Sequence, residues 1–260
     1  MFHSYAAIGD SFTEGVGDEV AGGAVRGWAD LVALGLAQAA APEPVRYANL
    51  AIRGKKLGPI VEEQLDAAIA LAPEVISFNG GGNDILRPRM PLETVAGRFR
   101  GAIGRIREAG IHALMLSGAN PSDHLPLGRV MDRRGDELTA ELRDLAELPG
   151  VTFVDNFSDR GLRDLRYWSA DRLHLGPLGH ARVAANVLRA LDVPVPAEWG
   201  VDEIAAEFAA DPSGSRARST AAYYREYVMP WIGRRLTGRS SGDGRVAKRP
   251  ALDAVELPAS

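Results

Sequence analysis

Near the start of the chain stands the segment Tyr5-Ala6-Ala7-Ile8-Gly9-Asp10-Ser11-Phe12-Thr13-Glu14-Gly15. Its first four residues form a short apolar run, which predicts a buried strand. Gly9 and Gly15 bracket the serine and predict a turn at the carboxyl end of that strand. An open α/β sheet carries its ligand crevice at this end, so we expect the Ser11 hydroxyl at the rim of a site. Because Gly-Asp-Ser is also ordinary turn chemistry, a catalytic role for Ser11 depends on partners elsewhere in the chain.

The pattern of the first strand recurs along the chain. Four further short apolar runs alternate with segments of helical spacing, which predicts strands at 5–8, 46–51, 75–78, 112–116 and 151–155 and helices at 28–41, 60–70, 92–109, 129–148 and 177–191. Short apolar strands that alternate with helices predict a parallel sheet covered on both faces. We therefore expect an α/β fold over residues 1–195: a three-layer α/β/α sandwich with a five-stranded parallel flavodoxin-like sheet.

Residues 196–260 differ in composition, and we expect a helical C-terminal extension with a flexible basic tail. Nine Lys and Arg residues stand against two acidic residues between positions 213 and 250. Tyr224, Tyr227, Val228 and Trp231 recur at three- and four-residue steps, which predicts one apolar helix face docked on the α/β domain. A nucleic-acid or membrane-surface arm is the alternative role for the basic residues. The last ten residues are expected to be disordered.

The amino-acid composition argues against several classes of protein function. The 260 residues are 46% hydrophobic and 25% charged, as in an ordinary soluble globular protein, and the net charge of −4 argues against broad nucleic-acid binding. The absence of cysteine excludes a thiol nucleophile, and the five histidines lack ligand-like spacing, so we predict neither a metal nor a cofactor. Without a leader or an apolar run of about 18 residues, the sequence as written predicts a cytoplasmic protein with no transmembrane segment. It leaves the oligomeric state open.

Polar residues near the other strand ends could serve the serine. Gly54 follows the second predicted strand, Asn83 follows the third, and Asp171 and His174 lie beyond the fifth. His174 could accept the Ser11 proton, and Asp171 could fix the imidazole tautomer. The Ser11 N–H, the Gly54 N–H and the Asn83 side-chain amide could bind the negative oxygen that develops on an attacked carbonyl.

These residues fall in four blocks that together resemble the SGNH hydrolases, the GDSL-type esterases and lipases. The blocks run in the family's order as Gly9–Gly15, Asn49–Gly54, Gly81–Asp84 and Asp171–His174. The resemblance implies a serine ester hydrolase with Ser11 as nucleophile, His174 as base, Asp171 as its partner, and an oxyanion hole of Ser11, Gly54 and Asn83. Phe12 is a mild departure from the family's nucleophile block, in which Leu or Ile would be equally familiar at this position. The basic tail lies outside the blocks and receives no role from the resemblance.

Several points stay open at this level. Acyl transfer to an alcohol would use the same serine site, and a catalytically silent binding module is the alternative from another class. The expected partner is a small-molecule ester. Because residues 16–26 and 117–128 should shape the pocket and contain few bulky apolar side chains, a small acyl group such as acetyl is favoured. Asp10, Glu14 and Asp84 are interpreted as turn caps or solvated charges, and His180 as a surface residue of a helix.

Overall fold

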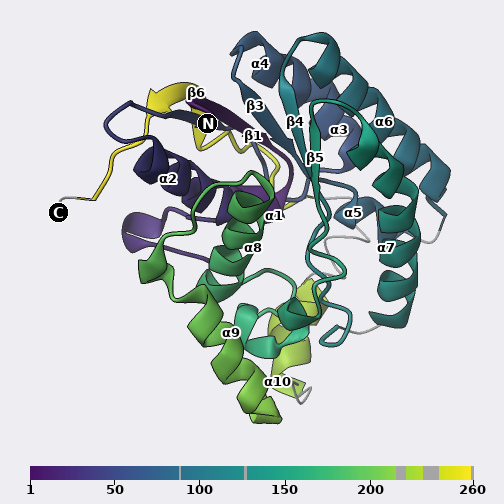
Figure 1. Ribbon diagram of the computed structural model, residues 1–260. Helices are drawn as coiled ribbons and strands as arrows, with labels where there is room; N and C mark the ends of the chain where they lie inside the picture. Colours follow the sequence, from purple (N-terminus) through teal and green to yellow (C-terminus); the bar gives the residue numbers. More distant parts are fainter. Residues whose placement is uncertain (88, 126–127, 215–220, 231–239, 259–260) are drawn as a thin grey trace.

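A single six-stranded sheet forms the middle layer of the molecule, in the order β5-β4-β3-β1-β2-β6 (Figure 1). The computed structural model describes residues 1–87, 89–125, 128–214, 221–230 and 240–258. The strands are β1 Ser4–Ile8, β2 Arg46–Asn49, β3 Val75–Phe78, β4 His112–Leu116, β5 Val151–Val154 and β6 Arg249–Ala254. β1 to β5 are parallel, so the predicted flavodoxin-like order is confirmed for them. β6 is an additional strand that the sequence did not predict, antiparallel to β2.

Helices cover both faces of the sheet, as expected for a three-layer sandwich. One face carries α2 and α8, and the other carries the α3–α4 segment, α6 and α7. The α-helices are α1 Ser11–Glu14, α2 Trp28–Ala40, α3 Leu57–Pro59, α4 Leu65–Ala70, α5 Gly82–Ile85, α6 Leu92–Glu108, α7 Gly128–Leu142, α8 Pro177–Ala190, α9 Val201–Ala210 and α10 Ala221–Tyr223. Shorter 3-10 turns are Ala21–Gly23, Arg143–Glu147, Arg160–Arg163, Leu165–Tyr167, Ala197–Trp199 and Pro212–Gly214, and π-helical turns are Ile60–Gln64 and Tyr224–Val228.

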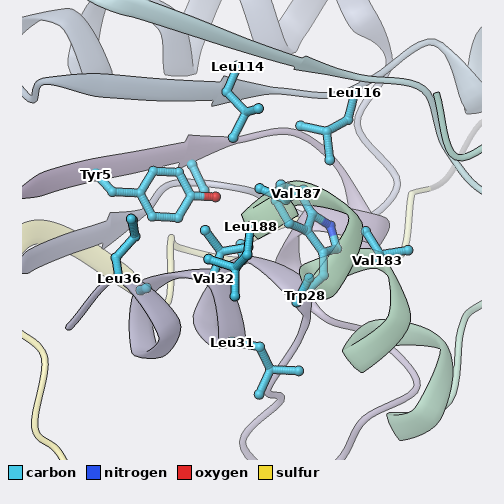
Figure 2. Packing of buried hydrophobic residues seen from close by; sticks show 14 of the residues in the cluster. Tyr5, Trp28, Leu31, Val32, Leu36, Leu114, Leu116, Val183, Val187 and Leu188 are labelled. Atoms are coloured by element: carbon cyan, nitrogen blue, oxygen red, sulfur yellow. The ribbon is translucent and has the colours of Figure 1, made fainter. Parts of the chain in front are cut away.

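The two faces of β1 feed two separate cores. Tyr5 and Ala7 point into the cluster shared with α2 and α8, whereas Ala6 and Ile8 point into the cluster shared with α6 and α7. Figure 2 shows the first cluster, where Trp28 and Leu188 from the two helices pack under the sheet. Alternate residues of a strand face opposite sides of a sheet, so a strand buried on both sides is mostly apolar. This explains why β1 reads as a continuous apolar run.

The end of the chain returns to the body of the protein. β6 pairs with β2, with Tyr47 opposite Asp253, so the prediction of disorder in the last ten residues is wrong for positions 251–254. Just before β6, the Lys248 ammonium donates to the Asp30 carboxylate at 2.6 Å and to the Glu14 carbonyl at 2.6 Å. These contacts anchor the C-terminal strand against the end of α1 and the first turn of α2.

The predicted helix near residue 225 is present over residues 221–230, as α10 and the π-helical turn Tyr224–Val228. Its buried face differs from the predicted one. Val228 is buried as expected, but Tyr224 is 41% exposed and the neighbouring Tyr223 is buried in its place. Trp231 lies outside the described residues, and the division of the chain at residue 195 stays a prediction. Within the described parts of the chain, no helix is both long and apolar enough to cross a membrane.

Candidate active site

The predicted nucleophile lies where two neighbouring parallel strands send their connections in opposite directions. From β1 the chain leads to β2 at one side, whereas β3, at the other side of β1, continues to β4. Crevices at such switch points are the usual ligand sites of open α/β sheets. Ser11 is the first residue of α1, which starts there, and Asp10 caps this helix by accepting the Phe12 N–H at 3.1 Å. The local sequence therefore places the Ser11 side chain at the carboxyl edge of the sheet.

One cavity of about 140 Å³ contains three of the five predicted site residues: Ser11, Asn83 and His174. From these polar residues it extends between the carboxyl ends of β3 to β5 and the helices α6 and α7. Its apolar lining comprises Phe12, Ile85, Leu86, Phe99, Leu116, Ala119, Pro121, Met131, Leu138, Leu142, Phe157, Trp168, Leu173 and Leu175. Residues 117–119 and 121 come from one of the two loops expected to shape the pocket, whereas no residue from 16–26 belongs to its lining. The site thus has a polar mouth and an apolar interior.

Asp171 and His174 are joined in the manner expected of an orienting carboxylate and its base. The His174 Nδ1 lies 2.6 Å from Asp171 Oδ2. The other carboxylate oxygen, Oδ1, accepts from the Ser169 hydroxyl at 2.7 Å and from the N–H groups of Leu173 and His174 at 2.9 Å each. Burial alone would raise the pKa of Asp171, but the hydrogen bond and charge of His174, with the backbone donors, hold this pKa well below its usual range. The carboxylate therefore stays ionised and fixes the imidazole.

Ser11 and His174 share the cavity without a direct hydrogen bond between these two described side chains. The Nδ1 of His174 faces Asp171, which leaves Nε2 as the nitrogen that can accept a proton from a hydroxyl. Hydrogen bonds between a nucleophile and its base are often looser in structures without substrate. The arrangement can support proton transfer once a bound substrate draws the two side chains together.

The Asn83 amide, which lines the same cavity as Ser11, is held by two acceptors. Its Nδ2 donates to the Lys55 carbonyl at 3.0 Å and, through a longer contact of 3.3 Å, to Asp10 Oδ2. Burial raises the pKa of Asp10 to about 6, and the nearby His174 acts in the opposite direction as a weaker influence. Because the contact with Asp10 is long, that N–H is the one that a substrate oxygen could recruit.

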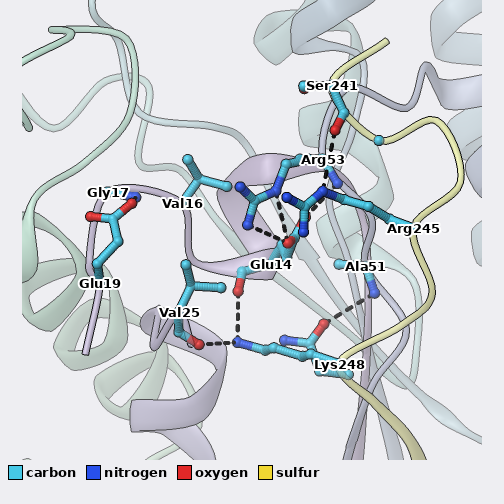
Figure 3. A network of polar contacts seen from close by, with 12 residues as sticks. Glu14, Val16, Gly17, Glu19, Val25, Ala51, Arg53, Ser241, Arg245 and Lys248 are labelled. Carbon is cyan, nitrogen blue, oxygen red and sulfur yellow. Dashed lines mark hydrogen bonds and ion pairs between the residues drawn. The ribbon is translucent and has the colours of Figure 1, made fainter. Parts of the chain in front are cut away.

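Gly54 lies in the loop after β2 and is not among the residues that line the cavity. It has a left-handed backbone with φ of +76°, and a Cβ there would stand 2.3 Å from the Ser240 hydroxyl. The preceding residue ties this loop to α1. Glu14 accepts the Arg53 backbone N–H at 2.6 Å and the Arg53 guanidinium Nε at 2.8 Å, and Lys248 holds the Glu14 carbonyl (Figure 3). The role of Gly54 in an oxyanion hole stays a prediction.

Three interpretations of polar residues need correction. Glu14 is a buried partner of Arg53 and Asp84 is a buried acceptor for the Leu57 N–H at 2.9 Å, so neither is a solvated charge. His180 is fully buried in α8, where Nδ1 accepts the Trp28 N–H at 3.2 Å. Burial lowers the pKa of His180 to about 4, because the charged ring would lose its hydration. Elsewhere in the described chain, no three His, Asp or Glu side chains come together as a metal-binding group.

Sequence reasoning missed the apolar wall of the site. Phe99, Leu138 and Phe157 come from α6, α7 and the segment after β5, and each reads in the sequence as an ordinary core residue. One local signal was available at Gly135 in α7. A Cβ at that position would stand 2.0 Å from the Phe157 ring, so the glycine lets an aromatic side chain lie directly on the helix. Glycine inside a helix costs stability relative to alanine and points to such a close approach.

The sequence model of the GDSL-like lipase/acylhydrolase family matches residues 7–182. Among curated proteins, no sequence matches the chain significantly.

Several solved structures share the fold. An acetylxylan esterase from Geobacillus stearothermophilus superposes with a TM-score of 0.60 at 20% identity, covering 74% of this chain and 95% of its own. A mutant from the same organism, described as an acetyl-xylooligosaccharide esterase, gives 0.63 at 20% identity with the same coverage. An α/β hydrolase from the metagenome of Lake Arreo, Spain, gives 0.58 at 20% identity over 73% of this chain and 95% of its own. At this identity the likeness concerns the fold alone.

Proposed function

Because the chain belongs to the GDSL-like lipase/acylhydrolase family and is thereby an ester hydrolase, we propose that it cleaves esters of short-chain carboxylic acids through an acyl-serine intermediate on Ser11. The observation that carries this proposal is the hydrogen bond between Asp171 and His174, because His174 lines the same cavity as Ser11. A nucleophile, a base and a fixed orienting carboxylate at one polar mouth suit acyl transfer.

In the proposed reaction, the Ser11 Oγ attacks the ester carbonyl while His174 Nε2 takes the hydroxyl proton. The ionised Asp171 stabilises the imidazolium that results. The developing oxyanion is bound by the Ser11 N–H and by the Asn83 N–H that leaves its long contact with Asp10. His174 then gives its proton to the leaving alcohol, and the acyl group remains on Ser11. A water molecule, activated by the same His174, attacks the acyl-serine and releases the acid.

The structural neighbours add support from their descriptions. Three structures of the Geobacillus acetylxylan esterase are described as catalytic mutants, with alanine in place of a serine, an aspartate and a histidine. The substituted aspartate and histidine are three positions apart in that protein. Asp171 and His174 have the same separation here.

The cavity supports a short and apolar acyl group. Its interior is lined by side chains such as Phe99, Leu138 and Leu142, which favour hydrocarbon over a polar group. Its volume of about 140 Å³ is close to that of an engineered apolar cavity of about 150 Å³ that binds one benzene ring. Because the carbonyl occupies part of this space, acyl groups of roughly two to six carbons fit.

A chain-length series of p-nitrophenyl esters, from acetate to dodecanoate, tests both parts of the proposal. We expect kcat/KM to fall steeply beyond about six carbons. Leu138→Phe should lower the rate on the hexanoate at least tenfold and the rate on the acetate less than threefold, because the larger ring fills the apolar end. Leu145→Phe is the matched control, since Leu145 is buried in the same core but does not line the cavity. A preference for dodecanoate, or an equal loss on all esters with Leu138→Phe, contradicts the assignment of the cavity.

A further inference from the structure

A segment outside the region matched by the family model reaches the catalytic loop. The match ends at residue 182, and residues 221–230 follow it at a distance of almost forty positions. Within this segment Tyr223 is only 5% exposed, although Ala222 and Tyr224 on either side are exposed. Its burial therefore comes from contact with another part of the molecule and not from a core within the segment.

The partner of Tyr223 is the residue that orients His174. The Tyr223 hydroxyl donates to the backbone carbonyl of Asp171 at 3.1 Å. The side chain of the same aspartate bonds the His174 ring at 2.6 Å. The hydrogen bond to the Asp171 carbonyl thus restrains the backbone that places the Asp171 carboxylate against the imidazole.

Arg172, the residue after Asp171, adds a second contact with Tyr223. Arg172 has a left-handed backbone with φ of +60°, a conformation that a side chain other than glycine adopts only at a cost. Its guanidinium lies over the Tyr223 ring, 3.9 Å from the ring centroid. Cation–π attraction at this distance favours the observed turn. The turn matters for the site because it directs the Leu173 and His174 N–H groups onto Asp171 Oδ1.

Backbone hydrogen bonds within the loop hold part of its shape: the Ser169 N–H donates to the His174 carbonyl at 2.9 Å, and the Arg172 N–H donates to the Ser169 carbonyl at 2.9 Å. Between residues 168 and 176 it contains one isolated bridge, from Trp168 to Leu175, and no helix or strand. Sites on loops are held less accurately than sites on helices or strands unless neighbouring groups fix them. The Tyr223 ring and hydroxyl supply such a group from the C-terminal extension.

We propose that Tyr223 is a positioning residue for ester hydrolysis, which holds the Asp171–His174 loop through the Asp171 carbonyl and the Arg172 guanidinium. The inference rests on the proposed function, because it takes His174 as the base. It gives the C-terminal extension a part in turnover in addition to its part in folding. Displacement of a catalytic group by about 1 Å can lower the rate by about 10²-fold, so a residue that touches no substrate can still govern kcat.

The test compares Tyr223→Phe, Tyr223→Ala and the control Met229→Ala in the full-length protein with p-nitrophenyl butyrate. Tyr223→Phe keeps the ring over Arg172 and loses one hydrogen bond, so kcat should fall about three- to tenfold. Tyr223→Ala loses both contacts, and kcat should fall on the order of 10²-fold with KM within twofold of the wild type. Met229 is 60% exposed in the same segment, and its replacement should leave kcat unchanged.

A double-mutant cycle separates positioning from general stability. Once Asp171→Ala has removed the orienting carboxylate, Tyr223→Ala should lower kcat by less than about twofold more, because no aspartate remains to be positioned. Wild-type kcat in Tyr223→Ala, or an equal loss in both backgrounds, overturns the inference. If Tyr223→Ala does not fold, a wild-type kcat in Tyr223→Phe overturns it as well. A His174→Ala variant that retains activity would instead refute the proposed function itself.

Discussion

Replacement of Asp171 by asparagine should harm catalysis more than its small change in shape suggests. In the wild type, Asp171 Oδ1 accepts from one hydroxyl and two backbone N–H groups, and Oδ2 bonds His174 Nδ1. In Asp171→Asn the amide oxygen must stay with these donors, so the amide NH₂ faces His174. The imidazole then has to accept through Nδ1 and carry its proton on Nε2, where it cannot take the Ser11 proton.

The size of the effect follows from the two backbone donors. Turning the amide over would leave the Leu173 and His174 N–H groups without an acceptor, at a cost of about 1–3 kcal/mol each. The productive tautomer is thereby disfavoured by a factor of roughly 30 to 10⁴. The same substitution in a serine-protease triad lowers kcat by about 10⁴. We therefore expect a loss in this range at unchanged KM.

The assay is steady-state hydrolysis of p-nitrophenyl butyrate, with the melting temperature measured on the same samples. Asp171→Ala is the comparison, because it removes the carboxylate without placing an NH₂ against the ring, and it should retain at least as much activity as Asp171→Asn. A kcat for Asp171→Asn within tenfold of the wild type would refute the reasoning about the tautomer.

Three further predictions concern the oxyanion donor, a buried histidine and the C-terminal chain. Asn83→Ala should lower kcat by roughly 10²–10³ with little change in KM; a lower melting temperature with unchanged kcat would show that Asn83 only caps its turn. Because burial lowers the pKa of His180 to about 4, the unfolded chain binds a proton near pH 6.5 that the folded chain does not, and stability declines as the pH falls from about 6.5 to 4. His180→Gln should therefore flatten the melting temperature over this range, and an unaltered slope would contradict the burial argument. Truncation after Pro212 removes β6 and the Lys248 contacts and should lower the melting temperature by more than about 5 °C; unchanged stability with lost salt-sensitive binding to RNA or anionic vesicles would favour a binding arm.

The parallel sheet could be predicted from sequence because its central strands β1, β3 and β4 are buried and mostly apolar. Ser11 and Asn83 could be expected at one edge because they follow β1 and β3, and the carboxyl ends of parallel strands meet there. β6 could not be found in this way. It is an edge strand with mostly exposed side chains and contains Pro250, so its sequence resembles that of a solvated tail.

For two helices, the 3.6-residue spacing of apolar side chains was either overlooked or predicted the wrong buried face. His180 is followed by Val183, Ala184 and Val187, which is the spacing of one buried helix face, so its burial was open to prediction. Tyr223 was not predictable by the same rule. The turn Tyr224–Val228 is π-helical, and the wider turn places Tyr223 and Val228, five positions apart, among the buried residues. A period of 3.6 residues instead predicted that Tyr224 is buried.

The most direct test of an acyl-serine mechanism is covalent labelling with a fluorophosphonate, followed by peptide mass spectrometry. The account predicts one adduct, on Ser11, and concurrent loss of esterase activity, because only an activated serine reacts readily with this reagent. Ser11→Ala should remain unlabelled and lose at least about a thousandfold in kcat while it keeps its melting temperature. A label on another residue, or near wild-type hydrolysis by Ser11→Ala, would contradict the central claim.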